Sequence, residues 1–221
     1  MCRRLACWLR MTAHGRHVPR SKLFAIVGVL LCLALGLLGL GLLVARAYDP
    51  AFGTVHPFGN NDQVLDVAVG DLNGDGALDL VTGNEGQNYV FLNDGLGNFV
   101  SVHPFGDTAR TEGVAVGDLN GDGALDLVVS NNTGQDYVYL NDGSGAFHSG
   151  PVDCAAPPDS VHCFGGASDD TWSAAVGDLD GDGALDVVVG TYSSHLPNRV
   201  YLNDGLGGLS LASSLDNPGR T

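Results

Sequence analysis

Positive charge is nearly absent from most of this 221-residue chain. Seven of its ten Lys and Arg residues lie at or before Arg46, whereas all 25 Asp and Glu residues lie at or after Asp49. Beyond residue 47, only Arg110, Arg199 and Arg220 oppose the 25 acidic residues, which leaves a formal charge of −22 there. Because such a surface repels phosphates, nucleic acid is excluded as a partner.

Familiar catalytic signatures are also missing. The chain contains no Gly-x-Ser-x-Gly nucleophile turn, no His-Glu-x-x-His motif and no phosphate-binding loop. Its aspartates are numerous, but their spacing is explained by metal binding, so assigning a pair of them as acid and base would count them twice. We therefore predict that this chain is not an enzyme.

Cysteine is scarce and unevenly placed. Cys2, Cys7 and Cys32 lie near the N-terminus, whereas Cys154 and Cys163 lie in the acidic part with eight residues between them. No Cys-x-x-Cys spacing typical of zinc or redox sites occurs in the acidic part. Outside a reducing compartment, Cys154 and Cys163 are expected to form a disulfide, with two free thiols as the alternative.

Charge of either sign is absent from residues 23–44, which are rich in Leu, Gly, Val and Ala. This run is long enough to cross a bilayer as a helix. The basic residues before it predict a cytoplasmic leader at 1–22 and a transmembrane signal-anchor at 23–45, with the acidic part outside. Ala45-Arg46-Ala47 also fits a cleavage site, so a signal peptide ending at residue 47 and a secreted protein are the alternative.

What the chain does contain is one nine-residue stretch that occurs three times. The copies, at 71–79, 118–126 and 178–186, read Asp-Leu-Asn/Asp-Gly-Asp-Gly-Ala-Leu-Asp. Side-chain oxygens occupy positions 1, 3, 5 and 9, and the glycines at positions 4 and 6 permit a tight loop. Calcium prefers a shell of such oxygens, so each copy predicts a calcium site.

The residues around these loops predict strands rather than the helices of an EF-hand. Position 12, where an EF-hand has a glutamate ligand, is Thr82, Val129 or Val189. The flanking residues are apolar and often β-branched, which favours strands. In the first copy, strands are expected at residues 67–70, 78–83, 89–92 and 98–103, with an Asn-Asp-Gly turn between the last two.

Similarity between the copies extends beyond the loops, because the segment 89–95 recurs at 137–143 and 199–205. Four-stranded units at intervals of roughly 40 to 50 residues are typical of β-propeller blades. We therefore predict an all-β fold of three tandem four-stranded blades, a partial or open propeller after one N-terminal transmembrane helix. Within the repeat domain at 48–221, the blades are placed at about 52–99, 100–147 and 148–211, with an insertion around Pro151 to Ser168.

The stretch Val67–Val81, together with Tyr139–Phe147, resembles the FG-GAP/VCBS repeat family, whose calcium-binding blades also occur in integrin α chains. The resemblance covers about residues 52–211. It implies about three calcium ions, one in each hairpin loop, with the alanine at position 7 ligating through its carbonyl oxygen. The implied ligands are Asp71, Asn73, Asp75, Ala77 and Asp79; Asp118, Asn120, Asp122, Ala124 and Asp126; and Asp178, Asp180, Asp182, Ala184 and Asp186.

The same resemblance implies a calcium-binding extracytoplasmic module for recognition or adhesion, with a protein or a carbohydrate as ligand. The alternatives are a non-catalytic accessory part of an exported hydrolase or lyase, or a fragment of a larger propeller protein. Closed propellers use four to eight blades, so self-association that completes a ring is also expected. The third loop has Asp180 where the others have Asn, which predicts tighter calcium binding. Asn131-Asn132-Thr133 fits a glycosylation sequon.

Overall fold

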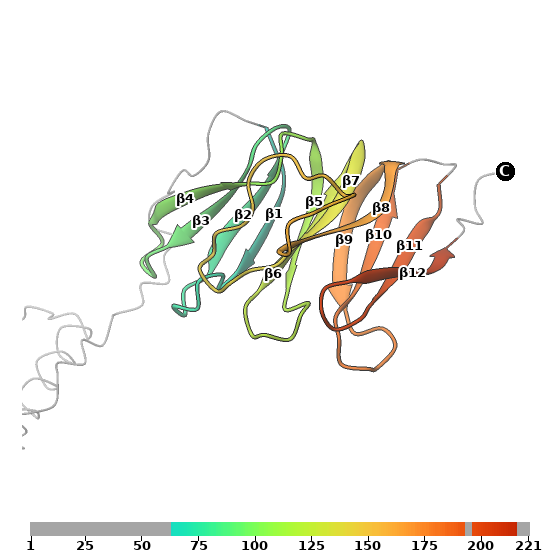
Figure 1. Ribbon diagram of the computed structural model, residues 1–221. Helices are drawn as coiled ribbons and strands as arrows, with labels where there is room; N and C mark the ends of the chain where they lie inside the picture. The colour runs from blue at the N-terminus through green and yellow to red at the C-terminus, as the bar shows by residue number, and fades with distance from the viewer. Residues whose placement is uncertain (1–62, 193–195, 216–221) are drawn as a thin grey trace, which may run out of the picture. The chain divides into compact units, whose positions relative to one another are not determined.

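The computed structural model describes residues 63–192 and 196–215, which fall within one compact unit, Thr54–Thr221 (Figure 1). The predicted leader and the predicted transmembrane segment lie outside the described residues. Within those residues, no helix is long and apolar enough to span a membrane.

Each repeat folds into a four-stranded antiparallel sheet in which neighbouring strands are consecutive in the chain. The prediction of three tandem four-stranded units in an all-β fold is therefore confirmed for this part of the chain, and the sheets are consistent with propeller-like blades. The first sheet contains β1 (Val64–Gly70), β2 (Asp79–Asn84), β3 (Asn88–Asn93) and β4 (Phe99–Phe105). The second contains β5 (Thr111–Gly117), β6 (Asp126–Asn131), β7 (Gly134–Tyr139) and β8 (Val161–Asp169). The third contains β9 (Thr171–Gly177), β10 (Asp186–Thr191), β11 (Asn198–Asn203) and β12 (Leu209–Leu215).

The three sheets lie side by side, with β1 contacting β5 and β5 contacting β9 (Figure 1). All six residues of β6 are buried, because the second sheet has a neighbour on both faces. Side chains alternate along a strand, so Leu127 and Val129 join a core shared with the first sheet, whereas Val128 joins one shared with the third. The sheets are therefore held together by two separate hydrophobic cores.

The sheets begin and end at other residues than the predicted blades at 52–99, 100–147 and 148–211. Strand β4 pairs with β3 and completes the first sheet, as expected for the strand at 98–103, so this sheet extends beyond the bound at residue 99. Strand β8, which pairs with β7, lies largely within the segment predicted to be an insertion. That segment therefore supplies the fourth strand of the second sheet.

The residues between β7 and β8 cross to the first sheet before they return. Gly106 donates a backbone hydrogen bond to His148 (2.8 Å) and accepts one from Gly150 (2.7 Å). Phe147 lies beside Phe105, with 6.0 Å between the ring centroids. A disulfide between Cys154 and Cys163 then ties the returning segment to β8. The detour therefore links the first and second sheets and shifts the fourth strand further along the chain.

Candidate metal centre

The three Asp-rich loops connect the first two strands of each sheet and project from the same end of the sheets, at the lower side of Figure 1. Two glycines in each loop have positive φ angles, 71° at Gly74 and 85° at Gly76 in the first loop. Only glycine adopts this backbone conformation readily. The glycines therefore give the loop the tight path on which the acidic side chains converge.

The aspartate at position 1 is oriented by the backbone of its own loop. In the first loop, Asp71 accepts hydrogen bonds from the N–H groups of Asp75 (3.1 Å) and Gly76 (2.8 Å). In the other loops the N–H groups of positions 4 and 6 donate, from Gly121 and Gly123 to Asp118 and from Gly181 and Gly183 to Asp178. These bonds fix the carboxylate inside the loop and leave it further lone pairs for a cation.

Positions 3 and 5 interact directly in the first loop. The Asn73 amide donates to Asp75 Oδ2 (3.0 Å), and Asp75 Oδ1 accepts from the N–H of Ala77 (2.8 Å). The second loop repeats both bonds with Asn120, Asp122 and Ala124. Position 7 therefore contributes its N–H to the loop, while its implied role as a carbonyl ligand stays a prediction.

The aspartate at position 9 is a buried brace as well as a predicted ligand. Asp79 is fully buried, and its two carboxylate oxygens accept hydrogen bonds from the N–H groups of Leu72 (2.9 Å) and Asn93 (2.8 Å). The equivalent bonds are Leu119 and Asn141 to Asp126, and Leu179 and Asn203 to Asp186. This side chain therefore joins the start of the loop to the end of the third strand.

The asparagine at that strand end is a site residue that the metal pattern does not include. Asn93 donates to the carbonyl of Leu78 (2.9 Å), and its side-chain oxygen accepts from Gly95 and Gly97. Asn141 and Asn203 occupy the same place in the other repeats. The recurrence of Leu-Asn-Asp-Gly in all three repeats is the sequence signal for this role.

The third loop brings its carboxylates closest together. Ligand oxygens of Asp178, Asp180 and Asp186 all lie within 4.8 Å of one another. Because Asp180 replaces an asparagine, it has no amide with which to donate to Asp182, and two carboxylates are adjacent instead. Their repulsion is relieved by a divalent cation. The donor set of this loop therefore fits calcium.

Burial adds to the electrostatic cost of placing these carboxylates close together. Desolvation raises the pKa of Asp126 above its ordinary value, and the nearby charges of Asp122 and Asp118 act in the same direction. Hydrogen bonds from the backbone of Asn141 and Leu119 lower that pKa but do not offset the burial. A bound cation would favour the charged form of these carboxylates.

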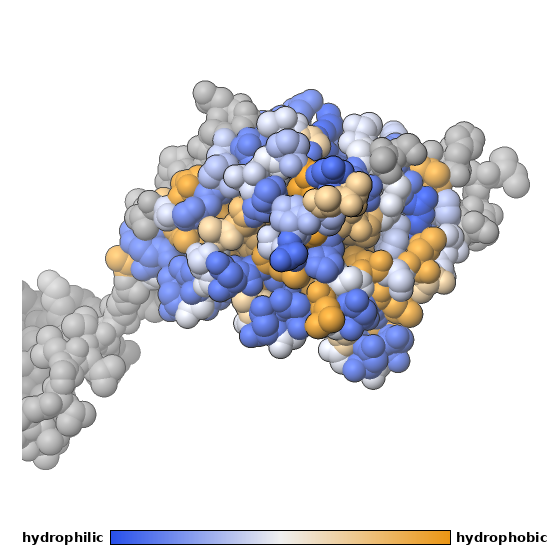
Figure 2. All heavy atoms as spheres, in the orientation of Figure 1, coloured by the Kyte–Doolittle hydropathy of each residue, from blue (hydrophilic) through white to orange (hydrophobic). Residues whose placement is uncertain are grey.

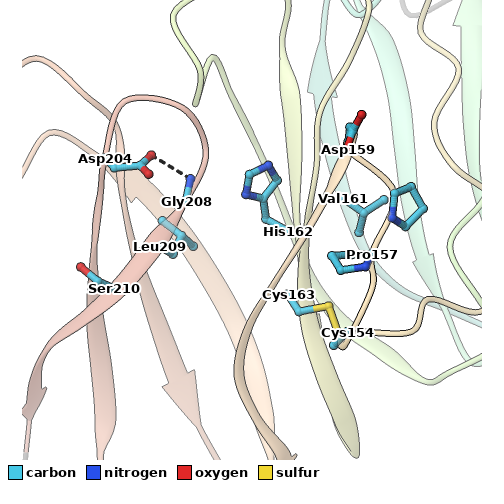
Figure 3. Close-up of a pocket in the computed structure, with 11 residues that line it drawn as sticks. Cys154, Pro157, Asp159, Val161, His162, Cys163, Asp204, Gly208, Leu209 and Ser210 are labelled. Atoms are coloured by element: carbon cyan, nitrogen blue, oxygen red, sulfur yellow. Dashed lines mark hydrogen bonds between the residues drawn. A yellow bond between two sulfur atoms is a disulfide. The ribbon is translucent and has the colours of Figure 1, made fainter.

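A separate groove of about 630 Å³ lies between the disulfide segment and the turn that joins β11 to β12 (Figure 3). His162 lies between its two walls, with Pro157 and Asp159 on one side and Asp204 and Leu209 on the other. The groove therefore combines carboxylates, an imidazole and apolar surface.

The glycosylation sequon falls on a side chain that the fold uses. Asn131 is buried at the end of β6, where its side-chain amide donates to the carbonyl of Gln135 (2.6 Å) and its oxygen accepts from Thr111 (2.9 Å). A glycan on this nitrogen is incompatible with the folded structure.

Comparison with known proteins places these loops in a family. A family model described as an FG-GAP-like repeat matches residues 71–129 and 118–189, which together include all three loops. The chain belongs to the FG-GAP-like repeat family. This confirms the resemblance found in the sequence.

This FG-GAP-like chain was also compared with curated proteins and with solved structures. A search of curated proteins gave no match. Among solved structures, the chain is similar to a lectin from Agrocybe aegerita, described as specifically recognising non-reducing terminal N-acetylglucosamine, with 28% identity and a TM-score of 0.47. That match covers 69% of this chain but only 38% of the lectin chain.

Proposed function

We propose that this chain is a calcium-binding recognition module that works outside the cytoplasm and catalyses no reaction. The observation that carries the proposal is the convergence of the third-loop carboxylates within 4.8 Å, on a loop pattern that occurs three times. Calcium would be held by the residues at positions 1, 3, 5, 7 and 9 of each loop, about three ions in all. The ion would supply positive charge that fixes the loops at one end of the sheets.

Two features support an extracytoplasmic location. The disulfide between Cys154 and Cys163 is typical of proteins outside a reducing compartment. Extracellular calcium modules bind the ion with dissociation constants of roughly 10⁻⁴ to 10⁻³ M, concentrations that the cytoplasm does not sustain. The export route, by a membrane anchor at 23–45 or by a signal peptide ending at residue 47, remains part of this proposal.

Recognition is assigned to the groove beside the disulfide and to the neighbouring loop surface. The groove offers Asp159, Asp204 and Ser210 as hydrogen-bonding groups and Leu209 as an apolar contact. Sugar hydroxyls and polar protein side chains both bind to such a mixture of groups. A glycan array probed with the full chain in calcium tests the carbohydrate case. Binding that His162→Ala abolishes supports the groove, whereas binding unaffected by that change rules the groove out.

Calcium binding is tested by titration calorimetry of the full chain. We expect about three sites, each weakened separately in Asp75→Asn, Asp122→Asn or Asp182→Asn, because position 5 then loses its formal charge and keeps only an amide oxygen. At ten times the dissociation constant, each site stabilises the fold by about 1.4 kcal/mol. Asp153→Asn, an exposed aspartate outside the loops, is the matched control. No heat of binding, and melting unaffected by chelation, would contradict the proposal.

The third site is expected to bind calcium more tightly than the others, because Asp180 adds a formal charge that Asn73 and Asn120 lack. Asp180→Asn should therefore weaken that site to the level of the other two, and Asn73→Asp should strengthen the first. Equal affinities in all of these variants would show that the extra carboxylate does not reach the ion.

A further inference from the structure

The packing between sheets follows a repeated rule at position 2 of each calcium loop. Leu72 and Leu119 are each only 1% exposed, because each is covered by the following sheet. Leu179, the equivalent residue of the third loop, is 53% exposed. The third sheet therefore presents a leucine with no cover from the described residues.

Position 8 of each loop packs in the opposite direction, on the preceding sheet. A Cβ atom placed on Gly70 would lie 2.8 Å from Leu125 Cδ1, and one on Gly117 would lie 2.8 Å from Leu185 Cδ1. Leu78, the equivalent residue of the first loop, is 62% exposed. A Cβ on Gly177, the equivalent glycine of the third sheet, would meet no atom within 4 Å. Leu78 of the first sheet therefore has no glycine to pack on, and Gly177 of the third sheet has no leucine packed on it.

A hydrogen bond follows the same rule. Asn141 donates across the sheet boundary to the carbonyl of Leu72 (2.8 Å), and Asn203 donates to the carbonyl of Leu119 (2.7 Å). The Asn93 side-chain amide instead donates within its own sheet, to the carbonyl of Leu78 (2.9 Å). By the same rule, a further bond would join the Asn93 amide, as donor, to the carbonyl of Leu179 on an adjoining sheet.

The sheet faces show the same mismatch in burial. Val114 is 6% exposed between the first and second sheets, whereas its equivalent Val67 is 51% exposed. On the opposite side, Phe105 and Phe164 are at most 4% exposed, whereas Leu215, in the same register position, is 49% exposed. Hydrophobic side chains are accordingly visible over β11 and β12 in Figure 2.

We call the surface around Val67, Val69 and Leu78 the leading face, and the surface around Leu179, Val188 and Leu215 the trailing face. The leading face is open only near β1 and its loop, because Thr82 and Phe91 on the same side of the sheet are already buried. Around β1 and its loop, the leading face exposes the residues whose equivalents are packed at the internal junctions. The two faces are complementary to each other and not to themselves.

We propose that the trailing face of one copy of this chain binds the leading face of a second copy, and so continues the internal packing of the sheets. Leu78 of the second copy would lie over Gly177 of the first, and Asn93 would donate to the carbonyl of Leu179. Two copies joined at both pairs of faces would bring together six sheets of the described residues, within the four to eight blades of closed propellers. The partner is a second copy because this surface repeats a contact that the chain already makes twice.

The test measures the assembly of the full chain by sedimentation velocity, in calcium and in mild detergent because of the apolar residues 23–44. We expect a two-chain species. Leu78→Asp and Leu179→Asp should each raise its dissociation constant by at least about 30-fold, the effect of losing a central interface residue. Leu96→Asp is the matched control: Leu96 is 59% exposed, and its counterpart Ser144 stays exposed beside a neighbouring sheet.

Mixing the two variants distinguishes this contact from any other. A Leu78→Asp chain keeps a normal trailing face and a Leu179→Asp chain keeps a normal leading face, so a one-to-one mixture regains one intact contact and should associate more strongly than either variant alone. Each replaced leucine is exposed in the single chain, so the circular dichroism spectrum should not change. The melting temperature should also stay the same when it is measured at a dilution at which the parent chain is dissociated. A monomeric parent chain, an assembly equally weakened by Leu96→Asp, or a mixture no stronger than its components would overturn the proposal.

Discussion

The two junctions between neighbouring sheets use the same positions but different chemistry. At the first junction, the Asn88 amide donates to the Thr111 hydroxyl (2.9 Å), which donates to Asn131 (2.9 Å). At the second, the residue in place of Asn88 is Asp136, which accepts from the Thr171 hydroxyl (2.6 Å). At this position the first junction therefore has neutral groups and the second has a buried carboxyl.

The carboxyl makes the second junction electrostatically costly. Burial raises the pKa of Asp136 from 3.8 to about 6, although hydrogen bonds from Thr171 and Asn131 lower it. Asp169 raises the pKa further, and Arg199, which pairs with Asp169, lowers it. Asp136 Oδ2 is buried and has no hydrogen-bond partner among the described residues. The same position of the repeat can therefore hold a neutral Asn88 at the first junction and an ionisable Asp136 at the second.

The largest effect is expected from removing the leucine that each junction buries. Leu119→Ala and Leu72→Ala should each lower the free energy of unfolding by about 2 to 5 kcal/mol, because both side chains are almost fully buried. Denaturant titration of each variant measures the loss. A loss below about 1 kcal/mol at either position would show that this junction is not held by its leucine. Leu206→Ala, at an exposed turn, is the control.

The buried carboxyl gives the next largest effect, and its sign depends on pH. Because the pKa of Asp136 is higher in the folded state, the folded state binds the proton more tightly, and stability falls as pH rises from about 4 to about 6. Asp136→Asn removes this loss. We expect it to raise the free energy of unfolding by up to about 3 kcal/mol at pH 7 and by little at pH 4.

Denaturant titration at both pH values measures this difference. The converse change, Asn88→Asp, introduces the same buried carboxyl at the first junction and should lower stability at pH 7 more than at pH 4. A benefit of Asp136→Asn that is equal at both pH values would show that packing, not ionisation, separates the junctions.

A second difference is how closely the first strands approach. A Cβ on Gly113 would lie 2.8 Å from the Cα atom of Ser173, so β5 and β9 meet through their backbones. At the first junction the equivalent residue is Asp66, whose carboxylate accepts from the N–H of Val114 (2.9 Å). Gly113→Ala should therefore cost about 1 to 3 kcal/mol of stability by pushing the strands apart.

Thermal unfolding measures this cost. Ser173→Ala, on the other side of the same contact, removes only an exposed hydroxyl and should change stability by less than about 0.5 kcal/mol. If Gly113→Ala also lowered stability by less than about 0.5 kcal/mol, β5 and β9 would be able to move apart at no cost. The two junctions would then differ only in the charge at Asp136.

Much of the fold could be predicted from the sequence because the information is local. The glycines and aspartates of each loop fix a tight turn, and the apolar residues beside it alternate as strands do. The strand expected at 67–70 begins three residues earlier, at Val64, and the one expected at 98–103 runs from Phe99 to Phe105. The bracing asparagines were also present in the repeated Leu-Asn-Asp-Gly pattern.

What could not be predicted depends on neighbours in space. Strand β8 lies within an apparent insertion, because a segment with no counterpart in the other repeats detours to Gly106 before the strand forms. Leu78 and Leu125 have the same local sequence, yet only Leu125 packs on a neighbouring sheet. Likewise, nothing in the sequence around Asp136 distinguishes a buried carboxyl from an exposed one.

The smallest expected difference lies at the exposed rims of the two junctions. At the first rim, Arg110 pairs with Glu112 (2.6 Å) and Glu85 (3.3 Å). At the second, the Asn132 amide of the second sheet donates to Asp170 (3.1 Å). Beside Asp170, Trp172 of β9 stacks on Tyr192, which follows β10 in the same sheet, with 4.1 Å between ring centroids. Ion pairs at an exposed rim are screened by salt, whereas ring stacking is not.

Tyr192→Ala should therefore lower stability by about 0.5 to 1 kcal/mol, because both rings are partly exposed. The loss should be the same in about 0.1 M and about 1 M salt. Arg110→Ala should instead have an effect that shrinks as salt is added. Unfolding followed by the fluorescence of Trp172, in a Trp8→Phe background, measures both variants. A salt-dependent loss in Tyr192→Ala would mean that the second rim is held by the Asp170 carboxylate, which accepts from the Trp172 indole (3.1 Å), rather than by the stacked rings.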